Sequence, residues 1–301
     1  MAALICGSLA FDTIMTFEGR FASQILPDQL HILNVSFLVP GLRRDFGGCA
    51  GNIAYSLHLL GGKPLPMAAV GDDGASYVAR MQSQGIDTRY VRQLAGNYTA
   101  QAMIMTDSDN NQITAFHPGA MTAAHTANVI DGSEGASIGI ISPDGRDAML
   151  EHAAQFYAAK IPFVFDPGQG LPMFSGQELL AFVEQASWIA VNDYEAKMLC
   201  ERTGLDLPGL SHKVRGLVVT LGSQGCEIWE QGHKALLAPC VPQQVVDPTG
   251  CGDAWRGALL YGLEQGWPLA RCAQLGNRVG ALKVASKGPQ NYTLDFDPAT
   301  A

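Results

Sequence analysis

The chain has 301 residues, with 19 Lys and Arg residues against 28 Asp and Glu residues, so its formal net charge is −9. Hydrophobic residues make up 47% of the chain and charged residues 16%, which is enough apolar side chain for a large core and excludes an intrinsically disordered chain. The acidic balance argues against nucleic acid or an anionic membrane surface as a partner, and no apolar run approaches the roughly 18 residues of a membrane span.

Short apolar runs that end in Gly, Asp or Pro alternate with apolar-periodic stretches along the chain. Strands are predicted at residues 3–6, 138–141, 163–165, 188–191, 217–220 and 245–246. Helices are predicted at residues 52–60, 77–84, 148–159, 176–185, 194–203, 254–264 and 269–285. Strict alternation from about residue 136 predicts an α/β fold with a central, mostly parallel sheet and helices on both faces.

Two segments interrupt this alternation, at about residues 14–46 and 97–118. The second consists of two extended runs around the turn Asp107-Ser-Asp-Asn-Asn111, and such turns are typical of hairpins. We interpret both segments as a small β-lid on one domain that spans residues 1–301.

The cysteine pattern points to a reducing compartment. The seven cysteines are odd in number and scattered, and no Cys-x-x-Cys occurs, so neither a disulfide framework nor a cysteine zinc site is expected. The apolar N-terminus lacks a basic region and is interrupted by Asp12, which favours a first strand over a signal peptide. We therefore expect a cytoplasmic protein.

A strand, a glycine-containing turn and a helix follow each other in Asp247-Pro-Thr-Gly-Cys-Gly-Asp253. A helix N-terminus leaves backbone N–H groups unpaired and carries partial positive charge, so glycines there permit close approach of a phosphate. Asp253 beside such a site would accept the proton of a hydroxyl that attacks phosphorus. The alternative is that Asp253 only caps the helix.

This segment resembles the C-terminal signature of the ribokinase (PfkB) family of carbohydrate and nucleoside kinases, usually written D-T-x-G-A-G-D. Here Pro248 replaces the usual Thr and Cys251 the usual Ala, while both glycines and the final Asp are kept. The resemblance implies a ribokinase-like fold. It also implies that Asp253 is the catalytic base and that the backbone amides of Gly250, Cys251 and Gly252 form an anion hole.

Other segments support the resemblance in the order expected along the chain. Gly47-Gly48-Cys-Ala-Gly-Asn52 is similar to the Gly-Gly-x-x-x-Asn motif that contacts sugar hydroxyls, and Asp12 matches the Asp that binds a vicinal diol. Glycine permits close approach and an amide both donates and accepts, which suits hydroxyl groups. Each motif alone would be ordinary turn chemistry.

The resemblance also implies a nucleotide site. Asn192-Asp-Tyr-Glu195 is similar to the Asn-x-x-Glu motif, in which Asn192 borders the nucleotide and Glu195 holds Mg²⁺ through water; the alternative is an acidic helix start. Thr220-Leu-Gly222-Ser-Gln-Gly225 is similar to the nucleotide loop, and Asn277 would border the adenine of ATP. Residues 247–249 and 286–290 fall where many members of the family bind a monovalent cation, so K⁺ is expected beside ATP and Mg²⁺.

Several segments, including Arg256 after the predicted base, resemble the bacterial nucleoside-kinase and adenosine-kinase-like branch. A nucleoside base needs apolar walls, and the lid offers Phe17, Phe37, Met103, Phe116 and Met121. The alternative is that these side chains form the lid's own core. Gln112 and Gln169 are candidates for hydrogen bonds to the edge of the nucleobase or to a hydroxyl group of the acceptor.

The expected function is ATP-dependent phosphorylation of the 5′-hydroxyl of a ribonucleoside such as adenosine or inosine, by a monomer or homodimer. One alternative is a sugar kinase of the same family acting on ribose, fructose or a sugar acid. Another is a non-catalytic regulator that binds nucleosides or nucleotides. A nicotinamide-dependent oxidoreductase is disfavoured because no Gly-x-Gly-x-x-Gly follows the first strand.

Overall fold

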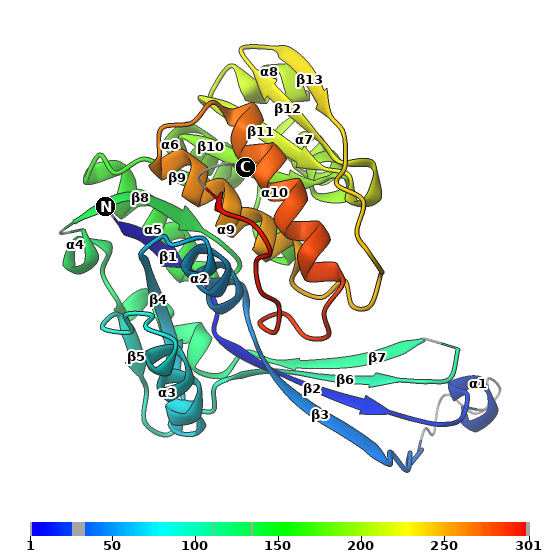
Figure 1. The fold of residues 1–301 in the computed structure, drawn as a ribbon. Helices are drawn as coiled ribbons and strands as arrows, with labels where there is room; N and C mark the ends of the chain where they lie inside the picture. Colours follow the sequence, from blue (N-terminus) through cyan, green and yellow to red (C-terminus); the bar gives the residue numbers. More distant parts are fainter. Residues whose placement is uncertain (1, 26–33, 110, 134, 299–301) are drawn as a thin grey trace.

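Alternating strands and helices build a large, mostly parallel sheet, as the sequence predicts (Figure 1). The structure is a computed structural model that describes residues 2–25, 34–109, 111–133 and 135–298. In these ranges the sheet strands are β1 (Ala2–Cys6), β4 (Pro64–Val70), β5 (Val91–Gln93), β8 (Ala136–Ile141), β9 (Phe163–Phe165), β10 (Trp188–Asn192), β11 (Gly216–Thr220), β12 (Cys226–Glu230) and β13 (His233–Leu237). Their order is β13-β12-β11-β10-β9-β8-β1-β4-β5. The pairs from β11 to β5 are parallel, and β12 pairs antiparallel with β11 and β13.

Helices cover both faces of this sheet because its strands are apolar on both sides. Ala3 and Ile5 pack in one core with α2 (Cys49–Leu59), α3 (Ala75–Ser83), α9 (Cys251–Glu264) and α10 (Leu269–Val284). Leu4 and Cys6 face the other core with α5 (Arg146–Ala158), α6 (Gly176–Gln185), α7 (Asp193–Thr203) and α8 (Leu207–Ser211). The short helix α4 (Val129–Gly132) packs against α5.

A second sheet projects from the main body as a long arm (Figure 1). It contains β2 (Ala10–Thr16), β3 (Gly41–Gly47), β6 (Ala100–Thr106) and β7 (Gln112–His117) in the order β3-β2-β6-β7. We call it the lid sheet. The short helix α1 (Phe21–Gln24) lies at its far end.

Two of the aromatic side chains predicted for a base pocket lie at this far end instead. The rings of Phe17 and Phe37 are 5.0 Å apart, and both contact Phe21 at 5.9 and 5.2 Å. Phe17 and Phe37 therefore form the lid's own aromatic core, the alternative left open by the sequence. Met103 lies on the face of the lid sheet opposite Asp12 and is 42% exposed.

The predicted strand at residues 245–246 is wrong. The amides of Val246 and Asp247 both donate to the carbonyl of Val284 at the end of α10, at 2.8 and 3.1 Å. These residues are thus held by a helix end rather than by a strand, and Val245 is 75% exposed. None of the helices in the described ranges is long and apolar enough to span a membrane.

Candidate active site

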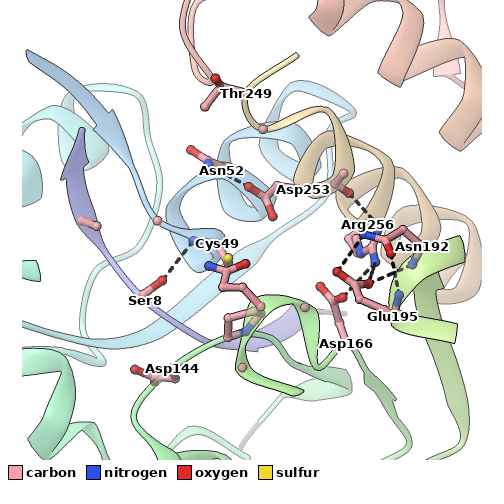
Figure 2. Close-up of a pocket in the computed structure, with 18 of the residues that line it drawn as sticks. Ser8, Cys49, Asn52, Asp144, Asp166, Asn192, Glu195, Thr249, Asp253 and Arg256 are labelled. Atoms are coloured by element: carbon pink, nitrogen blue, oxygen red, sulfur yellow. Dashed lines mark hydrogen bonds and ion pairs between the residues drawn. The ribbon is translucent and has the colours of Figure 1, made fainter. Parts of the chain in front are cut away.

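A cavity of about 770 Å³ lies at the carboxyl ends of the parallel strands, under the base of the lid sheet (Figure 2). This is where open α/β sheets bind ligands. The predicted site residues that line it are Asp12, Gly48, Asn52, Phe116, Gln169, Asn192, Glu195, Thr220, Gly222, Gly250, Gly252 and Asp253. Residues from the whole length of the chain therefore meet in one place.

The N-terminus of α9 points its first turn into this cavity. Gly250 is the N-cap in the left-handed region, with φ 78°, and a Cβ there would lie 2.6 Å from Cβ of Pro289. The amide of Cys251 donates to the carbonyl of Pro248 at 3.1 Å. Since that amide is already paired, the amides of the first turn that remain to form the predicted anion hole are those of Gly252 and Asp253.

The carboxylate of Asp253 is oriented by a hydrogen bond from Asn52. Its Oδ2 accepts from Nδ2 of Asn52 at 2.8 Å (Figure 2). Burial raises the pKa of Asp253 to about 6, although the hydrogen bond from Asn52 acts in the opposite direction. A carboxylate with that pKa is ionised at neutral pH and still basic enough to accept a proton in a reaction.

Asn52 is itself held by Gln290 and Tyr77, for which the sequence analysis predicts no contact with this residue. Nε2 of Gln290 donates to Oδ1 of Asn52 at 3.0 Å and to the hydroxyl of Tyr77 at 2.7 Å. The Tyr77 hydroxyl then donates to the carbonyl of Gly47 at 2.6 Å. This buried chain leaves Nδ2 of Asn52 directed at Asp253, so Asn52 orients the predicted base.

Asp12 lies on the cavity side of β2, opposite Ala102 of β6. Burial raises its pKa to about 6, and the charges of Asp45 and Asp253 add to the shift. A Cβ on Gly47 would lie 2.3 Å from Oδ2 of Asp12. Gly47 does not line the cavity, so its role is to leave room for the Asp12 carboxylate.

Gly47→Ala is expected to raise the KM for the phosphoryl acceptor about tenfold or more, because the methyl group would displace the Asp12 carboxylate, which is predicted to accept hydrogen bonds from the acceptor. The kcat should change little. Gly41→Ala, at the other end of β3, is the matched control because its Cβ would meet Thr16 at an ordinary 3.4 Å. Steady-state kinetics would contradict this role for Gly47 if both variants had the wild-type KM.

A buried ion pair lies close to Asp253, the predicted base. Nη2 of Arg256 lies 2.9 Å from Oδ1 of Asp166 and 3.8 Å from Oε2 of Glu195, and the Arg256 and Asp166 side chains are 6% and 4% exposed (Figure 2). Burial raises the pKa of Asp166, and Arg256 opposes that shift.

Two carboxyl groups of the cavity wall are missed by the sequence reasoning. Asp166 directly follows β9, and Asp144 follows β8. Burial raises the pKa of Asp144 to about 8, so it is protonated at neutral pH. Both could have been predicted from the sequence, because each acidic residue follows a predicted strand and therefore lies at the edge of the sheet where parallel strands bind ligands.

Asn192 and Glu195 form a reciprocal cap on α7. Oδ1 of Asn192 accepts from the amide of Glu195 at 2.8 Å, and Oε2 of Glu195 accepts from the amide of Asn192 at 2.8 Å. The segment is therefore an acidic helix start, the alternative left open by the sequence, and the same two side chains also line the cavity. Burial raises the pKa of Glu195, and the charge of Asp166 adds to that shift.

The carboxylate groups of the cavity suit a Mg²⁺ ion whose other ligands are water and substrate phosphates. No cluster of three His, Cys, Asp or Glu residues suited to a metal ion exists among the residues that the structure describes. Glu195 and Asp166 nevertheless offer carboxylate oxygens at the cavity wall. Mg²⁺ usually keeps several waters and uses few carboxylates together with substrate phosphates, which these residues suit.

A second cavity of about 340 Å³ adjoins the first and shares Thr220, Gly222 and Gly252 with it. The predicted residues Gly225, Cys251 and Asn277 line it, together with apolar side chains such as Val245. Asn277 is held by the indole N–H of Trp255, which donates to its Oδ1 at 3.0 Å, and its Nδ2 donates to the carbonyl of Ala238 at 2.9 Å. Burial raises the pKa of the Cys251 thiol to about 11.

Gln112 does not reach either cavity. It lies at the hairpin end of β7, opposite Thr106. Phe116, which lines the larger cavity, lies four positions further along the strand, ~13 Å away at the rise of an extended chain. The prediction that Gln112 contacts the acceptor is therefore wrong for this arrangement.

A lysine ammonium group lies between the segments expected to hold a monovalent cation. Nζ of Lys283 donates to the carbonyl of Asp247 at 2.6 Å and to that of Ser286 at 3.3 Å. The two segments do converge, and a charge supplied by the chain lies between them.

Comparison with known proteins agrees with this site. The family model described as pfkB family carbohydrate kinase matches residues 23–295. The nucleoside kinase of Methanocaldococcus jannaschii is 30% identical over 267 residues, covering 88% of this chain and 87% of that protein. The structure of Burkholderia thailandensis nucleoside kinase in complex with inosine has 48% sequence identity and a TM-score of 0.87, covering 97% of this chain and 93% of that chain. A second structure of that kinase, in complex with ADP-inosine, has 50% identity and a TM-score of 0.85, covering 97% of this chain and 92% of that chain.

The fold and the site thus define a kinase that uses a nucleotide to phosphorylate a hydroxyl group. The chain belongs to the pfkB family of carbohydrate kinases. The fold class and the family expected from the motifs are both confirmed.

Proposed function

We propose that this kinase transfers the γ-phosphoryl group of ATP to the 5′-hydroxyl of a ribonucleoside. The observation that carries the proposal is a row of side chains on the cavity face of the lid sheet. Asp12 pairs in register with Ala102, which pairs with Phe116, so the three side chains lie on one face. Two strand spacings separate Asp12 from Phe116, ~10 Å, which matches the length of a nucleoside from its ribose diol to its base.

The row divides the acceptor site into a polar end and an apolar end. Asp12 and Asp253 give the polar end two carboxylates that suit hydroxyl groups. Phe116, Met121 and Met173 line the apolar end, and a flat base gains from such contacts. The inosine complex of the Burkholderia thailandensis kinase supports this choice of acceptor.

The reaction would then be carried out by Asp253, the catalytic base, and the residues around it. Asp253 accepts the proton of the 5′-hydroxyl as its oxygen attacks phosphorus, and the amides of Gly252 and Asp253 stabilise the charge of the transferring group. The second cavity would hold the adenosine part of ATP, with Thr220 and Gly222 at the passage between the two sites. Closure of the lid sheet would exclude water, which competes as an acceptor.

Mg²⁺ belongs to this proposal as a companion of ATP. Glu195 and Asp166 would hold waters of the ion, and Asn192 would keep Glu195 in position by donating from Nδ2 to Oε1 at 2.9 Å. When bound, the ion neutralises charge on the phosphates.

The test is ADP release from Mg·ATP with adenosine, inosine, guanosine, cytidine, ribose and fructose as acceptors. We expect turnover of nucleosides and little turnover of free sugars. Phe116→Ala should raise the KM for the preferred nucleoside, whereas Ile113→Ala, on the opposite face of the same strand, should not.

Turnover of ribose or fructose alone would keep the fold and the catalytic base but replace the nucleoside by a sugar. A Phe116→Ala variant with an unchanged KM for the nucleoside would contradict the placement of the nucleobase against the Phe116 ring.

A further inference from the structure

Lys283 is a charged side chain with no exposed surface. It lies in the last turn of α10 and is 0% exposed. Its ammonium group donates to the carbonyl oxygens of Asp247 and Ser286, at 2.6 and 3.3 Å. Burying an ammonium group costs free energy unless hydrogen bonds and charges compensate it, so this placement requires an explanation.

The two carbonyls belong to the segments that shape the anion hole. Asp247 opens the turn that ends at the N-cap Gly250, and its Oδ1 accepts from the amide of Thr249 at 2.9 Å. Ser286 precedes the segment in which the amide of Gly288 donates to Oδ2 of Asp247 at 2.9 Å. Pro289 of that segment packs directly on Gly250: a Cβ added at position 250 would lie 2.6 Å from the Cβ of Pro289.

The surroundings of the ammonium group are those of a cation site. Backbone carbonyl oxygens are ligands that bound cations take from proteins. Burial lowers the pKa of Lys283 and the charge of Arg43 acts in the same direction, whereas the charges of Asp247 and Asp45 favour the protonated form. The side chain of lysine is a compact point charge with three donors, so it can stand where a monovalent ion would bind.

We propose that Lys283 is a positioning residue whose ammonium group serves as a built-in cation, holding the turn at residues 247–250 against residues 286–290, so that phosphoryl transfer needs no monovalent metal ion. The inference depends on the kinase activity of the family and not on which acceptor is phosphorylated. It replaces the K⁺ requirement expected from the motifs.

The first experiment measures kcat of the wild-type protein with its best acceptor in tetramethylammonium buffer, with K⁺ or Na⁺ added at constant ionic strength. We expect the kcat to stay within about twofold, because the cation position is already filled. Activation by K⁺ of about tenfold or more, the scale of a substantial loss of positioning, would overturn the proposal. An acceptor must first be found in the panel described above, so failure of the proposed substrate is seen separately.

The second experiment uses Lys283→Met, which keeps most of the volume and removes the charge, and Lys283→Ala, which leaves space for an ion. For Lys283→Met we expect a kcat lower by on the order of 10²-fold, the scale of a small misplacement in an active site, with the acceptor KM close to wild type. For Lys283→Ala we expect K⁺ or NH₄⁺ to restore part of the kcat and to raise the melting temperature.

Lys197→Met is the matched control, because that lysine is 77% exposed on α7. It should retain the wild-type kcat and show no response to K⁺. A wild-type kcat in Lys283→Met would contradict the proposal. So would the absence of any K⁺ or NH₄⁺ effect on both the kcat and the melting temperature of Lys283→Ala.

Discussion

Asp253→Asn is expected to lower kcat by about 10²–10⁴-fold, the usual contribution of a general base, with ATP and acceptor binding close to wild type. The amide keeps the shape of the carboxylate and can still accept the hydrogen bond from Asn52, which spans 2.8 Å in the wild type. What it loses is the ability to take the proton of the attacking hydroxyl. Single-turnover kinetics together with calorimetric binding of the acceptor would separate these effects.

The same residue determines how the rate depends on pH. Burial raises the pKa of Asp253 to about 6, and the base acts only when it is ionised. The kcat/KM of the wild type should therefore be level above about pH 7 and fall as the pH drops through 6. Asp12, whose pKa burial also raises to about 6, titrates in the same window and steepens the fall. A wild-type rate that is flat down to pH 5 would contradict the role of Asp253.

Stability supplies an independent check that Asp253→Asn is folded. The folded-state pKa lies above the usual value of 3.8, so the folded protein binds more protons than the unfolded chain between about pH 4 and 6. The stability of the wild type relative to the variant therefore falls as the pH rises through that window. We expect the variant to melt at a higher temperature than the wild type at pH 8, and the gap to narrow below pH 5.

Sequence reasoning predicted those site residues whose motif also marks the end of a strand or the start of a helix. Asp253, Asn192 and Thr220 each lie at the end of a strand or the start of a helix, and the topology brings such ends to one edge of the sheet. The long helices were predicted within a few residues because their apolar periodicity is strong. The helix predicted at residues 254–264 in fact begins at Cys251, so Asp253 lies inside the first turn.

The parts that were missed depend on contacts between distant segments. Gln290 donates a hydrogen bond to Asn52 from 238 positions further along the chain. No local sequence pattern around Gln290 predicts that contact with the residue that orients Asp253. Lys283 ends an amphipathic helix like any basic residue, and only the fold shows that its ammonium group is buried. Pro64–Val70 contains two prolines, which argue against a strand, yet burial between β1 and β5 makes it β4.

Arg256→Met is expected to lower the free energy of unfolding by about 3–5 kcal/mol, because breaking a buried ion pair leaves an uncompensated charge. The guanidinium group donates to Asp166 at 2.9 Å and to the carbonyl of Ala190 at 3.2 Å. Without it, Asp166 and Glu195 would face each other in a site where burial already raises the pKa of both carboxyl groups. Urea denaturation at pH 8 and at pH 5.5 would show the loss, which should shrink at the lower pH as these carboxyl groups take up protons.

The double variant Arg256→Met, Asp166→Asn separates the cost of the orphaned charge from a loss of packing. It should recover much of the lost stability, because the carboxylate that had been paired with Arg256 is replaced by a neutral amide. Lys197→Met, which removes only an exposed pair with Glu201, should change little. The rate gives a second readout: Arg256 holds the pKa of Asp253 down, so in Arg256→Met the acid limb of kcat/KM should move to higher pH. Equal stability of the single variant and the wild type would show that Arg256 does not compensate these carboxylates. An acid limb that stays in place would show that Arg256 does not tune the pKa of Asp253.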